Sequence, residues 1–125
     1  MEPRSSYLPW IDRAITEAVK ATGTYKLGAV VVSGNRVLAT GFNRKRNDPK
    51  YCEKGWSIHA EVSAIRKLKN RPFGPKTTIY VARITRAGKI AMAKPCETCE
   101  KAVYESGIKR IIYTTNEGAH LAVAE

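Results

Sequence analysis

The chain has 125 residues, 43% of them hydrophobic, which suits one domain over residues 1–125 and argues against disorder. Its 22 Lys and Arg residues outnumber 11 Asp and Glu, and the net charge of +11 favours anionic partners such as nucleotides, nucleic acids or anionic surfaces. No apolar run approaches the roughly 18 to 20 residues that span a bilayer, so we expect no membrane partner.

The N-terminal sequence and the cysteines indicate a cellular compartment. The opening stretch MEPRSSYLPWIDR lacks a basic segment followed by an apolar one, so we expect no signal peptide. The three cysteines, at positions 52, 96 and 99, are too few and too odd in number for a disulfide framework. Both observations favour a cytoplasmic location, where thiols stay reduced.

The first half of the chain predicts a helix, a hairpin and a loop. Apolar residues recur at helical spacing over 8–21. Two β-rich runs, 27–32 and 36–42, flank the sequence SGN at 33–35, which predicts a tight hairpin. The polar segment 43–57 is predicted to be a long loop, and long loops in small domains are usually functional.

A second helix is expected in the stretch SIHAEVSAIRKLKN. Ser57 is a candidate cap for its first turn. The apolar residues at helical spacing on its expected inner face are Ile58, Val62, Ile65 and Leu68.

The second half of the chain alternates strands and a helix. The stretch KTTIYVARI is predicted to be a strand, and the Ala-Gly step after it indicates either a return strand or an irregular loop. Residues 96–106 are predicted to form a helix opened by Pro95 and closed by Gly107, before the strand KRIIYTT. The strands on either side of this helix must be parallel, whereas the hairpin is antiparallel, so we expect a mixed sheet layered with helices.

The stretch KPCETCEK places Cys96 and Cys99 at the start of the third predicted helix. Such a pair can form a disulfide, act as a redox dithiol or bind a metal ion. A redox pair needs no distant histidine. Because His59 lies at the start of another predicted helix, the chain offers a third ligand, and this favours a metal site. Zinc accepts imidazole and thiolate ligands, and three protein ligands leave one position for water, as in catalytic sites. A fourth ligand, from Cys52 or His120, would instead indicate structural zinc.

Glu61 follows the histidine by two residues in the predicted first turn. It could approach a zinc-bound water without binding the metal, accept a proton and pass it to a substrate nitrogen. The alternative is an ordinary first-turn acid that the helix dipole favours.

These residues resemble a known family. HAE at 59–61 and PCETC at 95–99 are similar to the H-x-E…P-C-x-x-C signature of the zinc-dependent cytidine and deoxycytidylate deaminases. The resemblance extends over most of the chain, and HAEVSAIRKL and CEKAVYESGIKRIIY look more like the deoxycytidylate branch. It implies a three-layer α/β/α fold with a mixed sheet of about five strands. The short tail IIYTTNEGAHLAVA favours an antiparallel last strand, whereas parallel last strands are typical of the tRNA- and polynucleotide-editing relatives.

The resemblance also implies roles for individual residues. It assigns one Zn²⁺ ion to His59, Cys96 and Cys99. Glu61 would move protons, the backbone N–H of Ala60 would hold the pyrimidine carbonyl, and Asn43 would contact the sugar unless it is only a strand-end turn residue. The implied reaction is hydrolytic attack on the amine-bearing ring carbon with release of ammonia. Ser63 departs from the Asn that the deoxycytidylate branch often carries there.

The loop after the second strand bears on the substrate. Arg44 and Arg46 could reach a phosphate, and Trp56 could stack on a base or merely pack. The first hypothesis is therefore a deaminase of a cytosine nucleotide such as dCMP, and the second a deaminase of cytosine or adenine in single-stranded DNA or tRNA. The third is a non-enzymatic, zinc-stabilised module that binds nucleic acid. By analogy with relatives, we expect a homo-oligomer.

Overall fold

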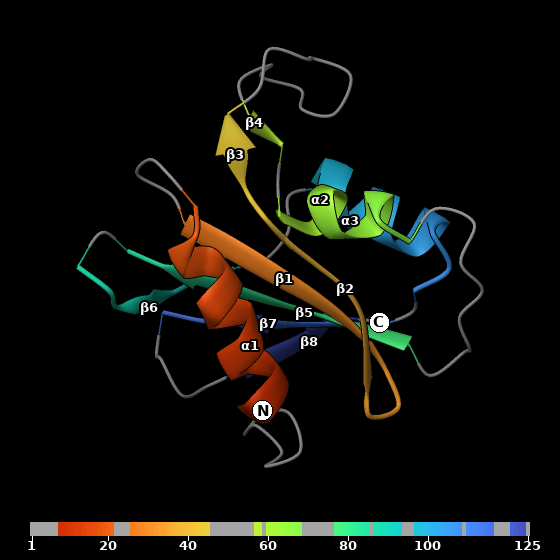
Figure 1. Cartoon of the computed structure of the whole chain (residues 1–125), viewed down its shortest axis with the longest axis horizontal. Coiled ribbons are helices and arrows are strands. Elements are labelled where there is room, and N and C mark those ends of the chain that lie inside the picture. Colours follow the sequence, from red (N-terminus) through yellow and green to blue (C-terminus); the bar gives the residue numbers. More distant parts are fainter. Residues whose placement is uncertain are drawn as a thin grey trace.

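The computed structural model describes residues 8–21, 26–45, 57–58, 60–68, 77–85, 87–93, 97–108, 110–116 and 121–124. In this part of the chain a β-sheet is covered by helix α1 on one face and by helices α2 and α3 on the other (Figure 1). This arrangement confirms the expected three-layer α/β/α fold.

The main sheet is mixed and has the strand order β2-β1-β5-β7-β8, with β6 paired to β5. Its strands are β1 (Lys26–Ser33), β2 (Arg36–Phe42), β5 (Thr77–Ile84), β6 (Ile90–Ala91), β7 (Arg110–Thr114) and β8 (Leu121–Ala124). Strands β5 and β7 are parallel, and every other pair is antiparallel. The predicted antiparallel last strand is therefore confirmed: Ile111 lies opposite Ala124, and Thr114 lies opposite Leu121.

Two turns predicted from the sequence are present. Ser33 lies opposite Arg36 at the end of the β1–β2 pair, so only two residues connect these strands, as the tight hairpin requires. After β5 the chain turns and returns as β6, with Ile84 opposite Ile90. Of the two alternatives left open for this segment, the return strand is the one observed.

The strands place alternate side chains in two cores. Val30 and Val32 of β1 face α1, together with Tyr80 of β5. Ala29 and Val31 face the other way, toward α2 and α3. This alternation is the period of two expected for a strand, and because both faces are covered, the central strands are apolar on both sides.

Helix α1 (Leu8–Val19) corresponds to the first predicted helix and lies very close to β1. A Cβ atom on Gly28 would overlap the backbone of Ala14 and Ala18, so no larger residue fits there. Helix α3 (Glu97–Glu105) corresponds to the helix predicted over 96–106.

The prediction of where the second helix starts is wrong. Ser57 does not cap it, because Ser57 and Ile58 form strand β4 (Ser57–Ile58), which pairs with β3 (Arg44–Lys45). Because these residues are paired in an extended conformation, helix α2 (Ala60–Arg66) begins only at Ala60. The ends of the predicted loop are thus held together as a two-stranded ribbon.

The predicted inner face of this helix is also wrong in part. Ile58 is not helical, and Val62 and Ile65 are only partly buried. The buried helical residues are Ala60, Glu61, Ser63 and Ala64. Small side chains face inward because α2 lies close to the sheet, where bulky ones would not fit.

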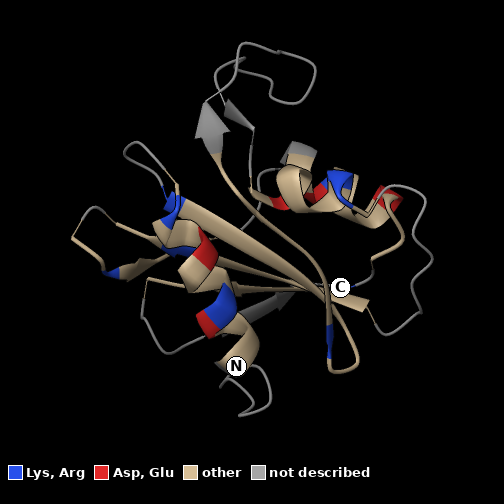
Figure 2. Ribbon diagram, in the orientation of Figure 1, with Lys and Arg blue, Asp and Glu red and all other residues tan. Residues whose placement is uncertain are grey.

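Two further observations concern the surface. Among the described residues, no helix has the length and apolar character needed to cross a membrane. In the same part of the chain, Lys and Arg are spread over helices and strand ends rather than gathered on one element (Figure 2).

Candidate active site

Glu61 lies in the first turn of α2, and its side chain is only 2% exposed. Its Oε1 atom has no hydrogen-bond partner among the described residues. Burial raises the pKa of this carboxyl from 4.5 to about 7, although a backbone hydrogen bond acts in the opposite direction. In the metal-free protein the carboxyl can therefore both hold and release a proton near neutral pH.

Cys99 lies in the first turns of α3 with 1% of its surface exposed. Helices α2 and α3 contact each other on the same face of the sheet, so this buried sulfur is on the helix that packs against the helix of Glu61 (Figure 1). Cys96 and His59 lie outside the described residues, each directly before the first residue of a helix. The complete set of three zinc ligands thus stays a prediction, and no three metal-binding side chains come together among the residues described.

Asn43 is buried where β2 ends, and it is bound to β1 twice. Its side-chain Oδ1 accepts a hydrogen bond from the backbone N–H of Leu27 at 2.8 Å. Its own N–H donates to the carbonyl of Leu27 at 3.2 Å. Asn43 therefore has a structural role at the strand end, and its proposed contact with a sugar is a separate prediction.

The backbone of α2 approaches β2 at Gly41. A Cβ atom there would lie 2.5 Å from the nitrogen of Ala64 and 2.8 Å from the carbonyl oxygen of Ala60, closer than real Cβ contacts. Ala60 itself is fully buried. This close approach fixes the depth of α2, and hence of Glu61, relative to the sheet.

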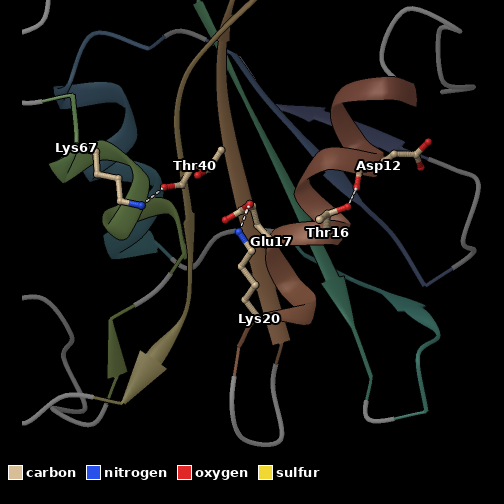
Figure 3. Close-up of polar contacts among 6 residues, drawn as sticks. All are labelled: Asp12, Thr16, Glu17, Lys20, Thr40 and Lys67. Atoms are coloured by element: carbon tan, nitrogen blue, oxygen red, sulfur yellow. Dashed lines mark hydrogen bonds and ion pairs between the residues drawn. The ribbon is translucent and has the colours of Figure 1, made fainter.

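A hydrogen bond joins the chain just after the C-terminal end of α2 to strand β2. The ammonium group of Lys67 donates a hydrogen bond to the carbonyl of Thr40 at 2.7 Å (Figure 3). The other polar contacts in this view, Thr16 with Asp12 in α1 and Glu17 of α1 with Lys20 just after it, do not involve α2.

The remaining predicted substrate contacts are only partly located. Arg44 lies in β3, opposite Ile58 of β4, so the chain after Asn43 runs beside the residues that precede α2. This ribbon extends beyond the end of the main sheet (Figure 1). Arg46 and Trp56 lie outside the described residues.

Sequence reasoning missed two residues that shape this region. Gly41 could have been noticed, because a glycine inside a strand often marks a close approach of another backbone. Thr114 is buried at the end of β7. Nothing in the sequence indicated its role, because Thr is common in strands of every kind.

Comparison with known sequences identifies relatives. Residues 4–115 match the family model described as the cytidine and deoxycytidylate deaminase zinc-binding region. A deoxycytidylate deaminase of Schizosaccharomyces pombe is 26% identical over 117 residues, which cover 78% of this chain and 33% of that protein. A tRNA-specific adenosine deaminase of Buchnera aphidicola subsp. Schizaphis graminum is 30% identical over 118 residues, which cover 88% of this chain and 65% of that protein. The chain thus spans about a third of the first relative and under two thirds of the second.

Solved structures share the fold. A cytidine deaminase from Burkholderia pseudomallei has a TM-score of 0.70 at 20% identity, with 95% of this chain and 91% of that chain covered. A dCMP deaminase from the cyanophage S-TIM5 has a TM-score of 0.64 at 22% identity, with coverages of 90% and 84%. Since the family model also matches nearly the whole sequence, the chain belongs to the cytidine and deoxycytidylate deaminase family, defined by its zinc-binding region.

Proposed function

We propose that this chain is a zinc-dependent hydrolytic deaminase that converts a cytosine nucleotide of the dCMP type to its uracil form and releases ammonia. Family membership supports the reaction class. The observation that carries the proposal is the buried carboxyl group of Glu61 in the first turn of α2, whose Oε1 has no hydrogen-bond partner among the described residues. A carboxyl in such a place can accept a proton and donate it again.

Two buried groups on the packed helices α2 and α3 support a zinc ion in this proposal. Cys99 supplies a buried sulfur, and Glu61 presents an oxygen without a partner among the described residues. In the proposal His59, Cys96 and Cys99 hold the metal, a donor set of imidazole and thiolates that zinc favours. Zinc bound there supplies Lewis-acid activation of a water molecule at neutral pH.

The chain's own groups carry the proton transfers. Glu61 accepts a proton from the attacking water as the new carbon–oxygen bond forms at the amine-bearing ring carbon. The same carboxyl then donates a proton to the amino nitrogen, the carbon–nitrogen bond breaks, and ammonia leaves. The backbone N–H of Ala60 holds the pyrimidine carbonyl during both steps in this proposal.

Three observations support a dCMP-like substrate. One relative is a deoxycytidylate deaminase, and the cyanophage enzyme with a similar fold was crystallised with dCMP and dUMP. Arg44 follows Asn43 in the chain, and in the proposal its cation contacts the phosphate while the amide of Asn43 contacts the sugar. The antiparallel β8 differs from the parallel last strand expected of polynucleotide-editing relatives. Arg46 and Trp56 complete the proposed contacts with the phosphate and the base.

A second candidate is deamination of a base in single-stranded DNA or tRNA. The relative that is 30% identical is a tRNA-specific adenosine deaminase, and a net charge of +11 exceeds what one phosphate needs. The third hypothesis is a non-enzymatic zinc module. It does not explain why the carboxyl of Glu61 is buried, although burial of such a group costs free energy.

A panel of substrates separates these functions. Purified zinc-loaded protein is incubated with cytidine, CMP, dCMP, a cytosine-containing DNA oligonucleotide and tRNA, and ammonia and base composition are measured. We expect dCMP to be converted with the highest kcat/KM. Conversion of an oligonucleotide or tRNA while dCMP is inert would overturn the first proposal in favour of the second. Failure of every substrate with zinc bound would support the third hypothesis.

A further inference from the structure

The segment Ala91–Ala93 lies just before the proposed zinc ligand Cys96, and it is tied residue by residue to the end of β7. The N–H of Met92 donates a hydrogen bond to Oδ1 of Asn116 at 2.8 Å. The N–H of Ala93 donates to the carbonyl of Thr114 at 2.9 Å. The hydroxyl of Thr114 donates to the carbonyl of Ala91 at 2.7 Å. Three consecutive residues are thus held by the last residue of β7 and by Asn116 in the turn that follows it.

The hydroxyl of Thr114 also joins a third strand. Its side chain is 0% exposed, and its oxygen accepts a hydrogen bond from the N–H of Arg83 in β5 at 3.2 Å. One hydroxyl therefore donates to β6 and accepts from β5 while it belongs to β7. A hydroxyl that uses both capacities in a buried site is fixed in orientation, and its removal takes one hydrogen bond from each of two backbone groups.

This junction lies at the edge of the sheet where a site is expected. Val81 of β5 lies opposite Tyr113 of the parallel strand β7, so both strands end at the same edge. Ligands of open α/β sheets bind beyond the carboxyl ends of parallel strands. From Ala93 only three residues lead to Cys96 in the sequence, a span of about 10 Å at most.

We propose that Thr114 and Asn116 are positioning residues that act through the backbone of Ala91–Ala93 to place the first cysteine ligand for metal binding. The inference rests on the proposed function, because it takes Cys96 as a zinc ligand. Neither side chain touches the metal or the substrate in this proposal. Partners that orient a metal ligand commonly change affinity about 10- to 100-fold when they are removed.

Paired variants test the proposal on the full-length, zinc-loaded protein. Asn116→Ala removes the acceptor for Met92, whereas Asn116→Asp keeps an oxygen at the same place. Thr114→Val removes the hydroxyl at constant shape, whereas Thr114→Ser keeps it. The zinc dissociation constant is measured by competition with a chromogenic chelator, and the cobalt-substituted protein is examined by its visible absorption spectrum.

We expect Asn116→Ala and Thr114→Val to weaken zinc binding about 10-fold and to alter the cobalt spectrum, while the Asp and Ser variants restore both. Thr16→Val is a matched control, since that hydroxyl also donates to a backbone carbonyl, that of Asp12 at 3.0 Å, but on the exposed side of α1. This control should leave zinc affinity and the spectrum unchanged.

The outcomes separate this inference from the proposed function. If the unmodified protein binds zinc but Asn116→Ala and Thr114→Val lower only the stability of the metal-free protein, the positioning role is overturned and the proposed function stands. If the unmodified protein shows no thiolate-to-cobalt absorption, the proposed function and the inference both fail. Should Thr114→Val not fold, the exposed Asn116 pair decides the question by the same two measurements.

Discussion

At the scale of single residues, the carboxyl group of Glu61 carries most of the proposed chemistry. A charged carboxylate that is 2% exposed loses much of its hydration, and this raises its pKa to about 7. The same burial lowers the free energy of unfolding of the metal-free protein above neutral pH, where the buried carboxyl is charged.

The first prediction concerns the stability of the metal-free protein as a function of pH. Because the folded-state pKa lies above 4.5, the folded protein binds more protons than the unfolded chain between pH 4.5 and about 7. The free energy of unfolding therefore falls through this window as pH rises. Glu61→Gln removes that fall, so its stability relative to the unmodified protein should increase by about 3 kcal/mol between pH 4 and pH 8.

Urea denaturation at several pH values measures this difference. Glu105→Gln on the exposed side of α3 gives the effect of losing a surface carboxylate. A stability difference between the Glu61 variant and the unmodified protein that stays constant with pH would contradict the prediction.

The second prediction concerns turnover. Glutamine cannot carry a proton between water and the leaving nitrogen, so Glu61→Gln should lower kcat by about 10²- to 10⁴-fold. Zinc content, measured by elemental analysis, should stay at one ion per chain, because Glu61 is not a ligand in the proposal. Unchanged turnover in this variant would rule out the mechanism.

Spacing along the sequence was sufficient to select Glu61 and Cys99 as candidates, but not to describe how they are held. Asn43 shows the difference: it was selected as a sugar contact or a turn residue, and the structure shows a two-way bond to Leu27. Partners 16 residues apart depend on strand register, which a single sequence does not specify at this precision.

At the scale of elements, the contact between α2 and β2 sets the position of the proposed catalytic group. The helix backbone passes so close to Gly41 that a single methyl group has no space. The neighbouring atoms belong to backbone, which cannot move aside as a flexible side chain would.

The third prediction follows from this contact. Gly41→Ala should reduce the free energy of unfolding by about 1 to 3 kcal/mol and also lower kcat, because α2 must shift away from the sheet. Chemical denaturation and steady-state kinetics measure the two effects.

Gly88→Ala provides the control. A Cβ atom there meets nothing within 4 Å, but its φ of +84° favours glycine, so this variant loses stability without moving α2. The kcat of Gly88→Ala should stay close to that of the unmodified protein. An equal loss of kcat in both variants would show that general destabilisation, rather than the position of α2, is responsible.

The sequence predicted the type and order of the main elements because local signals are strong: helical spacing in α1, β-rich composition in β1, and Pro95 and Gly107 around α3. It failed at the start of α2, where Ser57 looked like a cap. Pairing between Ser57 and Lys45 is a non-local interaction that competes with the local capping preference and prevails. The buried small residues of α2 were missed for a related reason, since apolar periodicity finds large side chains rather than close backbone contacts.

At the scale of the whole molecule, β8 completes the sheet by covering β7. The β7 residues Ile111, Ile112, Tyr113 and Thr114 are all buried. Without its antiparallel partner, β7 would present an open row of backbone donors and acceptors beside apolar side chains.

The fourth prediction is that deletion of residues 121–125 destabilises the fold by several kcal/mol and promotes association through β7. Thermal unfolding and size-exclusion chromatography of the metal-free protein measure the two effects. A truncated protein with unchanged unfolding temperature and elution volume would show that β8 contributes little.

The layered architecture was predictable because one hairpin and one parallel crossover leave few arrangements of five strands. Length and composition favoured a single domain over 1–125. A homo-oligomer was expected only by analogy with relatives, and both stay predictions. The return strand β6 was one of two alternatives for its segment, but its bonds to Thr114 could not be anticipated, because they depend on where β5 and β7 end relative to each other in space.

The pairing of β1 with β5 has a consequence for the order of folding. Ser33 lies opposite Thr77, so this one contact encloses a stretch of more than forty residues that contains Asn43, Ala60 and Glu61. The β1–β2 hairpin can form quickly from neighbours, whereas closing the larger loop is slower because distant segments must meet. We therefore expect the carboxyl of Glu61 to stay hydrated during the early collapse, and its pKa to rise only when the centre of the sheet closes.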